Sequence, residues 1–127
     1  LLSFSNFGNP IRPSSKNIRD AVNILIEREV DFEFDGEMTA EVALDHNLIR
    51  ENYPFCRLSG SANVLIMPGL LSANISFKLL QSLGGGSVLG PLMIGGEKPF
   101  QIVQMGSSVS DIVNSASIAA YNAIYSK

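Results

Sequence analysis

The residue types best suited to chemistry lie where a short apolar run meets a predicted helix, within "QIVQMGSSVSDIVNSASIAAYNAI" (101–124). The residues of interest at this junction are Gln104, Met105, Ser107, Ser108 and Asp111. Serine hydroxyls and free amide N–H groups at a helix N-terminus favour an anion, and Asp111 is able to hydrogen-bond a ligand amine or thiol. Gln104 and Met105, in contrast, are neither nucleophile, base nor fixed cation. On the residues alone, this junction is either an active site or a binding pocket that lacks reactive groups.

The same stretch has a purely structural interpretation. Either Ser107 or Ser108 is able to cap the helix, and Ser108-x-x-Asp111 resembles a capping box with Asp in place of Glu. Both interpretations stay open on the residues alone.

Two other reactive residue types occur once each. His46 is the single histidine, so a Ser-His-Asp site would have to use it. It stands in a polar stretch, residues 45–50, and we expect a solvated surface histidine. Arg57 beside Cys56 would lower a thiol pKa, but no second feature supports a nucleophile. We therefore expect Cys56 to be structural.

The sequence gives little support for a metal site or for a phosphate-binding loop. Asp35, Glu37 and Glu41 are close in sequence, but a strand end and a helix start carry such acids without a metal, so we expect no metal site. The glycines of "GGGSVLG" (84–90) follow a predicted helix and precede a predicted strand, the reverse of a dinucleotide-binding loop. We expect a turn at the helix C-terminus there.

The bulk composition limits the class of protein. The chain has 127 residues, enough for one domain with a core; 46% are hydrophobic and 17% charged. A net charge of -3 with scattered Lys and Arg does not favour a nucleic-acid partner. One cysteine excludes an internal disulfide and suits a cytoplasmic setting. No apolar run approaches the roughly 20 residues of a membrane span. The start without Met, inside a strand-like run, suggests a piece of a longer protein.

Strand and helix patterns alternate along the chain. Helices are expected at 14–29, capped by Ser14 or Ser15, at the start of 37–54, and at 70–83 and 108–124. Strands are expected at 1–4, 30–34, 64–69, 87–96 and 99–104. The alternation predicts an α/β fold with a mostly parallel sheet flanked by helices. Ligands bind such sheets beyond the carboxyl ends of the strands. The loops of interest are therefore 5–15, 35–38, 67–74, 90–98 and 104–110.

The order of four motifs adds a family resemblance. "DGEMTAEVAL", "SGSANVLIMPGLLSANISFKLLQSLGG", "VLGPLMIGGEKP" and "GSSVSDIVNSASIAA" together resemble the C-terminal part of the phosphate acetyl/butyryltransferase family. "LLSFSNFGN" and "YPFCRLSGSANVLIMP" resemble one branch in particular, the phosphotransacetylase-like domain fused behind the catalytic part of bacterial NADP-dependent malic enzymes. The resemblance runs through nearly the whole chain.

The resemblance implies a two-lobed, isocitrate dehydrogenase-like α/β domain with an acyl-CoA cleft between its lobes. Residues 1–127 would form the C-terminal part of this domain. Active acetyltransferases of the family end the strand before the last helix in Ser-Arg and carry an Asp in the first helical turn. Asp111 matches that Asp, whereas Gln104 and Met105 replace the Ser-Arg pair. The ligand-binding candidates are Asp111, Gln104, Met105, Ser107, Ser108, Gly90 and Pro91, and no catalytic residue is expected.

The departure at Met105 favours one function over the others. Transfer between CoA sulfur and phosphate builds negative charge, which a fixed guanidinium stabilises and a Met cannot. The resemblance therefore implies a regulatory module that binds acetyl-CoA without transferring the acyl group, and that acts on the malic enzyme catalytic domain of the same parent chain. NADP and a divalent metal would serve that parent enzyme, and no cofactor is expected in these residues.

Two alternatives remain open. One is an active phosphate acetyltransferase whose missing groups come from elsewhere. The other is a purely structural role in a homo-oligomer, suited by the small residues along the last helix, which are Ala116, Ala119, Ala120 and Ala123.

Overall fold

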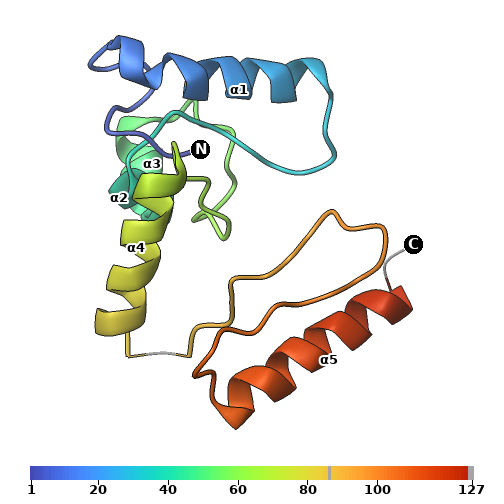
Figure 1. The fold of residues 1–127 in the computed structure, drawn as a ribbon. Helices are drawn as coiled ribbons and strands as arrows, with labels where there is room; N and C mark the ends of the chain where they lie inside the picture. The colour runs from blue at the N-terminus through green and yellow to red at the C-terminus, as the bar shows by residue number, and fades with distance from the viewer. Residues whose placement is uncertain (86, 126–127) are drawn as a thin grey trace. The chain divides into compact units, whose positions relative to one another are not determined.

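The computed structural model describes residues 1–85 and 87–125. They form a short 3-10 helix η1 (Pro13–Ser15) and the helices α1 (Lys16–Glu27), α2 (Ala40–Leu44), α3 (His46–Asn52), α4 (Leu70–Leu83) and α5 (Val109–Tyr125) (Figure 1). The chain divides into two compact units, Leu1–Leu79 and Leu80–Lys127. Each unit is described separately below.

The first long helix follows the predicted apolar stripe. Ile18 and Val22, one turn apart, are the buried residues of α1, so the predicted amphipathic helix is confirmed. The serine at the start of α1 does not form the predicted side-chain cap. Ser15 holds the N-cap position, but its hydroxyl donates to the carbonyl oxygen of Arg12 at 3.1 Å and accepts from Arg19 at 2.6 Å. This hydroxyl therefore joins a polar cluster and does not cap the helix.

The region after residue 37 is more regular than predicted. It holds two short helices, and Asp45 separates them. The Asp45 carboxylate accepts from the backbone N–H groups of Asn47 at 2.9 Å and Leu48 at 3.1 Å, which is the N-cap arrangement that starts α3. The prediction of an irregular stretch was wrong, because Asp45, a polar residue within a polar segment, caps the start of a helix.

The two later helices match their predicted bounds within one residue. The backbone N–H of Gly84 donates to the carbonyl of Leu80 at 2.8 Å, and Gly85 has a φ of +62°. A left-handed glycine just past the last helical residue ends helices in this way. The glycines 84 and 85 thus form the predicted helix-end turn, and Gly86 lies outside the described residues.

The predicted strands are not formed within the described residues. In residues 1–85 and 87–125, β pairing is limited to two isolated bridges, Leu2 with Met38 (parallel) and Asn6 with Asn9 (antiparallel). Leu2 also donates its N–H to the carbonyl of Ile66 at 2.8 Å. A strand needs repeated hydrogen bonds along a neighbouring segment. Among the described residues, the run 1–4 bonds twice to Met38 and once to Ile66, and these bonds do not continue as a ladder. The sequence patterns identified residues that are suited to strands, but a sheet also needs neighbouring segments that pair with them.

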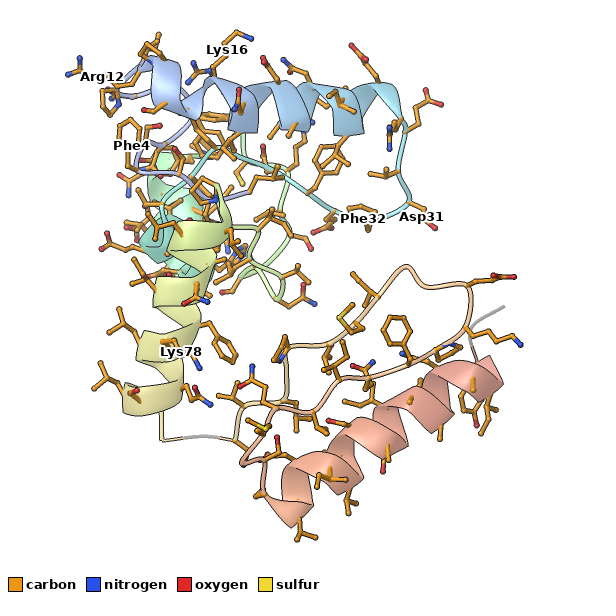
Figure 2. All side chains as sticks on the ribbon, in the orientation of Figure 1. Phe4, Arg12, Lys16, Asp31, Phe32 and Lys78 are labelled. Carbon is orange, nitrogen blue, oxygen red and sulfur yellow. The ribbon has the colours of Figure 1, made fainter. Side chains whose placement is uncertain are left out.

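The segment after α1 illustrates this difference. Its alternating pattern predicted a strand over 30–34, but the structure shows a loop in which Phe32 is 58% exposed. Figure 2 shows the side chains of Asp31 and Phe32 on this loop. The ring of Phe32 contacts that of Phe34 edge-on, with centroids 6.3 Å apart. Two aromatic residues of the alternating pattern therefore contact each other within the loop.

The apolar core lies in unit Leu1–Leu79. Its buried cluster consists of Leu2, Met38, Val42, Ala43 and Ile49. In contrast, α4 and α5 contain no buried residue, and their apolar side chains are largely exposed. No helix in the described ranges combines the length and apolar character of a membrane span.

Candidate functional site

A cavity of about 230 Å³ lies within unit Leu80–Lys127. Its walls come from the segments 88–92 and 102–107, from one face of α5 and from the end of α4. Six of the seven predicted ligand-binding residues line it, and these are Gly90, Pro91, Gln104, Met105, Ser107 and Asp111. The structure thus brings two separate loops together around one space. The ligand role of these residues stays a prediction.

A tight turn positions Gln104 and Met105 at the cavity wall. The N–H of Ser107 donates to the carbonyl of Gln104 at 3.1 Å, and Gly106 between them has a φ of +86°. A turn of this kind needs a glycine at its third position, because other residues are strained at positive φ. The turn leaves Met105 at its corner, where the side chain is fully exposed.

Ser108 and Asp111 form a reciprocal capping box. Asp111 Oδ2 accepts from the N–H of Ser108 at 2.9 Å and from its hydroxyl at 2.8 Å. The N–H of Asp111 donates in return to Ser108 Oγ at 3.2 Å. The hydroxyl bond, with the backbone bond second, holds the pKa of the Asp111 carboxyl below its ordinary value. The structural interpretation of this turn is therefore confirmed, and Ser108 does not itself line the cavity.

The two loops that wall the cavity are joined by a side-chain bridge. The Gln101 side chain accepts from the N–H of Met93 at 3.0 Å and donates to the carbonyl of Met93 at 3.3 Å. These two hydrogen bonds connect the segment 87–96 with the segment 99–104. They fix the spacing of the runs that carry Gly90 and Gln104.

Two polar residues of the wall were not predicted from the sequence, Gln81 and Ser115. Ser115 follows Asp111 by four residues, so both lie on the same face of α5. That spacing was a usable signal in the sequence. Gln81 had no such signal, because its place at the cavity wall depends on residues distant from it in the sequence.

The cavity lining carries negative charge. Among the described residues that line it, Asp111 is the only ionisable one, and none is Lys, Arg or His. The remaining lining side chains are aliphatic, thioether, hydroxyl or amide groups. This set is able to bind a ligand through apolar contact and neutral hydrogen bonds, but it offers no cation to stabilise negative charge that develops during a reaction.

The other reactive residue types are placed elsewhere. Cys56 is half-buried, and burial is the main cause that raises its pKa, so Arg57 does not activate the thiol. This supports the structural interpretation of Cys56. His46 begins α3 and is half-buried rather than solvated. Its Nδ1 is buried without a hydrogen-bond partner within the described part of the chain.

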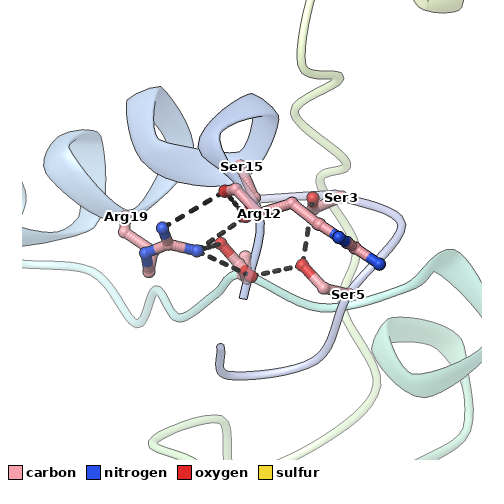
Figure 3. Close-up of polar contacts among 6 residues, drawn as sticks. Ser3, Ser5, Arg12, Ser15 and Arg19 are labelled. Carbon is pink, nitrogen blue, oxygen red and sulfur yellow. Dashed lines mark hydrogen bonds and ion pairs between the residues drawn. The ribbon is translucent and has the colours of Figure 1, made fainter. Parts of the chain in front are cut away.

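The clustered acids near residue 35 are occupied by contacts within the protein. Asp35 is buried, and its carboxylate accepts from the N–H groups of Gly36 at 2.8 Å and Arg57 at 2.7 Å. Glu37 is fully buried and binds Ser5 and Arg19 (Figure 3). Across the described ranges, no group of three or more His, Cys, Asp or Glu residues is placed to hold a metal ion.

A larger cavity of about 700 Å³ lies in unit Leu1–Leu79. It is lined mainly by apolar residues of α1 and of the segments 1–2, 32–38 and 62–66. These include apolar side chains such as Ile24, Phe32 and Val64 that are largely exposed. Its polar lining residues are Arg28, Glu33, Asp35 and Asn63, and both carboxylates already accept hydrogen bonds within the protein, Asp35 from Gly36 and Arg57 and Glu33 from Ser59. Most of the predicted ligand-binding residues line the smaller cavity, which is therefore the better candidate.

Comparison with known proteins identifies the family of this chain. The family model described as phosphate acetyl/butaryl transferase matches residues 1–120. The chain belongs to the phosphate acetyl/butyryl transferase family.

Relatives of this transferase-family chain include two kinds of protein. It is 56% identical over 123 residues to the NADP-dependent malic enzyme of Rhizobium meliloti, which covers 97% of this chain and 16% of that protein. It is 40% identical over 121 residues to the phosphate acetyltransferase of Treponema pallidum, covering 93% of this chain and 36% of that enzyme. The expected resemblance to the phosphotransacetylase-like region of malic enzymes is confirmed, and the chain spans only a small part of each relative.

A solved structure confirms the fold of this family member. The EutD phosphotransacetylase from Staphylococcus aureus superposes with a TM-score of 0.87 at 30% sequence identity. The match covers 96% of this chain and 38% of that one. The chain therefore has the fold of part of a phosphotransacetylase.

Proposed function

We propose that this chain is an acetyl-CoA-sensing region of an NADP-dependent malic enzyme, and that it binds the thioester without transferring its acyl group. The observation that carries the proposal is the cavity of unit Leu80–Lys127. Asp111, Gln104 and Met105 line this cavity, and the family resemblance implies that active transferases carry Ser-Arg at the positions of Gln104 and Met105.

The chemistry of the wall supports binding over turnover. Removing one oxyanion-type donor costs on the order of 100-fold or more in rate, and here both the hydroxyl and the guanidinium are replaced. The Gln104 amide is still able to hydrogen-bond a thioester or amide carbonyl. Met105 offers a flexible apolar contact for the pantetheine arm.

Regulation would act on the rest of the parent chain. An effector shifts activity only if it binds two states of the enzyme with different affinity. We propose that acetyl-CoA binding lowers malate oxidation by the catalytic domain, which would use NADP and a divalent metal bound outside these residues. A homo-oligomer in the cytoplasm is the expected setting.

The extended apolar runs fit the same proposal. We propose that the runs 1–4, 64–69, 87–96 and 99–104 become strands of a mostly parallel sheet when further residues of the parent chain pair with them. Val64 and Ile94, which are 67% and 86% exposed, would then be covered. The two units would contribute to the two lobes of the complete domain.

The test uses the full-length protein. We expect no CoA-dependent formation of acetyl phosphate above background, and a fall in malate-dependent NADPH formation when acetyl-CoA is added. Calorimetric titration should show that acetyl-CoA binds. Absence of both binding and inhibition would favour a purely structural role.

An active phosphate acetyltransferase is the second candidate, and the 40% identity to the Treponema pallidum enzyme favours it. In this case an arginine from outside residues 1–127 would complete the site. Clear acetyl transfer by the full-length protein would establish this alternative and overturn the first.

A further inference from the structure

We infer that Gln101 is a positioning residue for the cavity of unit Leu80–Lys127, and that its side-chain amide holds two walls of the cavity at the separation that binds the ligand. The inference rests on the proposed function, because the ligand is the acetyl-CoA proposed there. It adds a residue that does not itself line the cavity and that acts through its neighbours.

The Gln101 amide meets both backbone groups of one residue. Its oxygen accepts from the N–H of Met93 at 3.0 Å, and its nitrogen donates to the carbonyl oxygen of Met93 at 3.3 Å. A primary amide offers a donor beside an acceptor, as a peptide group does, so this side chain replaces one pair of bonds of a β ladder. The reversed amide would set its oxygen against the Met93 carbonyl, so one orientation alone satisfies both groups.

The bridge stands next to the cavity on both segments. Leu92 precedes Met93 and Ile102 follows Gln101, and both of these apolar residues line the cavity. From there the lining continues along each of the two segments. A change in the distance between Gln101 and Met93 would therefore change the separation of the two walls.

Few other contacts hold these walls together. Within residues 87–125, no backbone–backbone hydrogen bond joins the segment 87–96 to the segment 99–104 (Figure 1). Leu92 and Ile102 are 45% and 58% exposed, so apolar packing between the walls is only partial. The separation of the walls thus depends strongly on the two bonds of one side chain.

The loop that the bridge closes is tightly packed. A Cβ added at Gly96 would lie 2.8 Å from Cε1 of Phe100, so the ring of Phe100 lies directly against the backbone of Gly96. A short packed loop keeps Met93 within reach of Gln101 and lowers the entropy that is lost when the bridge forms.

A fixed separation of the walls should raise affinity. A protein whose binding-competent state is only partly populated binds with an affinity that is reduced by that fraction. Without the bridge the two segments would be free to separate, and part of the binding free energy of the ligand would go into restoring their spacing. Loss of the bridge should therefore weaken binding although every lining residue is unchanged.

The experiment measures acetyl-CoA binding to the full-length protein by calorimetry. Gln101→Met keeps the length of the side chain and removes both hydrogen bonds, and it should weaken binding about five- to tenfold. Glu97→Met is the matched control, because Glu97 lies in the same loop, is exposed and does not line the cavity. Equal affinities of Gln101→Met and the unaltered protein would overturn the inference.

Gln101→Glu separates the role of the amide from that of packing. A carboxylate accepts from the N–H of Met93 but cannot donate to its carbonyl, whereas a protonated carboxyl group does both. Lowering the pH from about 7 toward about 5 approaches the ordinary glutamate pKa of about 4.3, and the bond to the carbonyl favours the protonated form. The affinity of this variant, relative to that of the unaltered protein at the same pH, should therefore recover. A constant ratio would contradict the inference.

Hydrogen exchange, followed by mass spectrometry of the full-length protein, gives a readout that needs no ligand. The N–H of Met93 donates to Gln101, so it should exchange faster in Gln101→Met than in the unaltered protein. Unchanged exchange would mean that the bridge is absent in solution, and the inference would fail. If Gln101→Met does not fold, the pH dependence of Gln101→Glu still decides.

The outcomes separate the two proposals. If the unaltered protein binds acetyl-CoA and Gln101→Met raises the exchange of Met93 without weakening binding, this inference fails while the sensing role stands. If the unaltered protein does not bind acetyl-CoA, both fail.

Discussion

Arg19 donates from Nη1 to both carboxylate oxygens of Glu37, at 3.2 Å from Oε1 and 3.0 Å from Oε2. The Glu37 side chain is fully buried, whereas that of Arg19 is 31% exposed. Ser5 donates its hydroxyl to the same carboxylate, and Arg19 also bonds the hydroxyl of Ser15 (Figure 3). This cluster ties α1 to the first segment of the chain and to the segment before α2.

Replacing Arg19 by Met should destabilise the protein strongly. The change would leave a buried carboxylate without its cation, which costs on the order of 3 kcal/mol. Denaturant unfolding of the full-length protein should show a lower midpoint. Lys16→Met is the control, because its pair with Asp20 is exposed on the same helix and such pairs contribute less than about 1 kcal/mol. Equal shifts for the two variants would contradict the role given to Glu37.

Gly36 should tolerate no side chain. Its φ is +154°, and a Cβ there would lie 2.7 Å from the carbonyl oxygen of Leu1. Gly36→Ala is therefore expected to cost about 1 to 3 kcal/mol and to displace the first segment. Gly60→Ala offers a matched comparison, since no atom lies within 4 Å of its added Cβ. Thermal unfolding of the two variants should separate them clearly, and similar melting temperatures would refute this prediction.

The pKa of Asp111 should depend on Ser108. Ser108→Ala removes the hydroxyl donor but keeps the backbone N–H, so the pKa of Asp111 should rise toward 3.8 without reaching it. Carboxyl-carbon NMR of aspartate-labelled protein, assigned with Asp111→Asn, would measure the change. Ser110→Ala is the control on the same helical turn.

The sign of the pH effect follows from that shift. Because the folded pKa of Asp111 is depressed, its bonds to Ser108 stabilise the start of α5 above pH 3.8, and this contribution is lost as the pH falls through the lower folded pKa. An unchanged pKa in Ser108→Ala would mean that the hydroxyl bond is absent in solution.

Restoring the Ser-Arg pair should restore charge stabilisation. The double variant Gln104→Ser/Met105→Arg places a hydroxyl and a guanidinium on the turn that faces the cavity. If the rest of the transfer site is retained in the parent chain, acetyl phosphate formation should rise about 100-fold over the background of the unaltered protein. The single variant Gln104→Ser should stay near background. A rate in the unaltered protein equal to that of the double variant would show that the missing cation is supplied elsewhere.

The helices could be predicted from the sequence because their signals are local. The apolar spacing of Ile18 and Val22 and the glycines after Leu83 depend on neighbours within a few residues, and the structure follows them. The start of α3 was missed, although Asp45 is a good N-cap residue, because its segment is too polar to show an apolar stripe.

The strands could not be predicted in the same way. The run 64–69 has the composition of a buried strand, yet Val64 is 67% exposed, because pairing depends on segments distant in the sequence. The candidate site was predictable only in part. The helical turn from Ser108 to Asp111 was readable, whereas the approach of Gln81 to the cavity depends on tertiary structure.

Helix α5 carries Asp111 and Ser115 on the cavity wall, yet it buries none of its side chains within the described chain. A helix of 17 residues gains most of its stability from packing and has little of its own. Any protein surface that comes to cover α5 would therefore order the same residues that line the cavity and that we propose contact an acyl ligand. If that proposal holds, thermodynamic reciprocity requires that ligand and covering surface strengthen each other's binding by the same factor, so that a single helix would couple metabolite level to assembly.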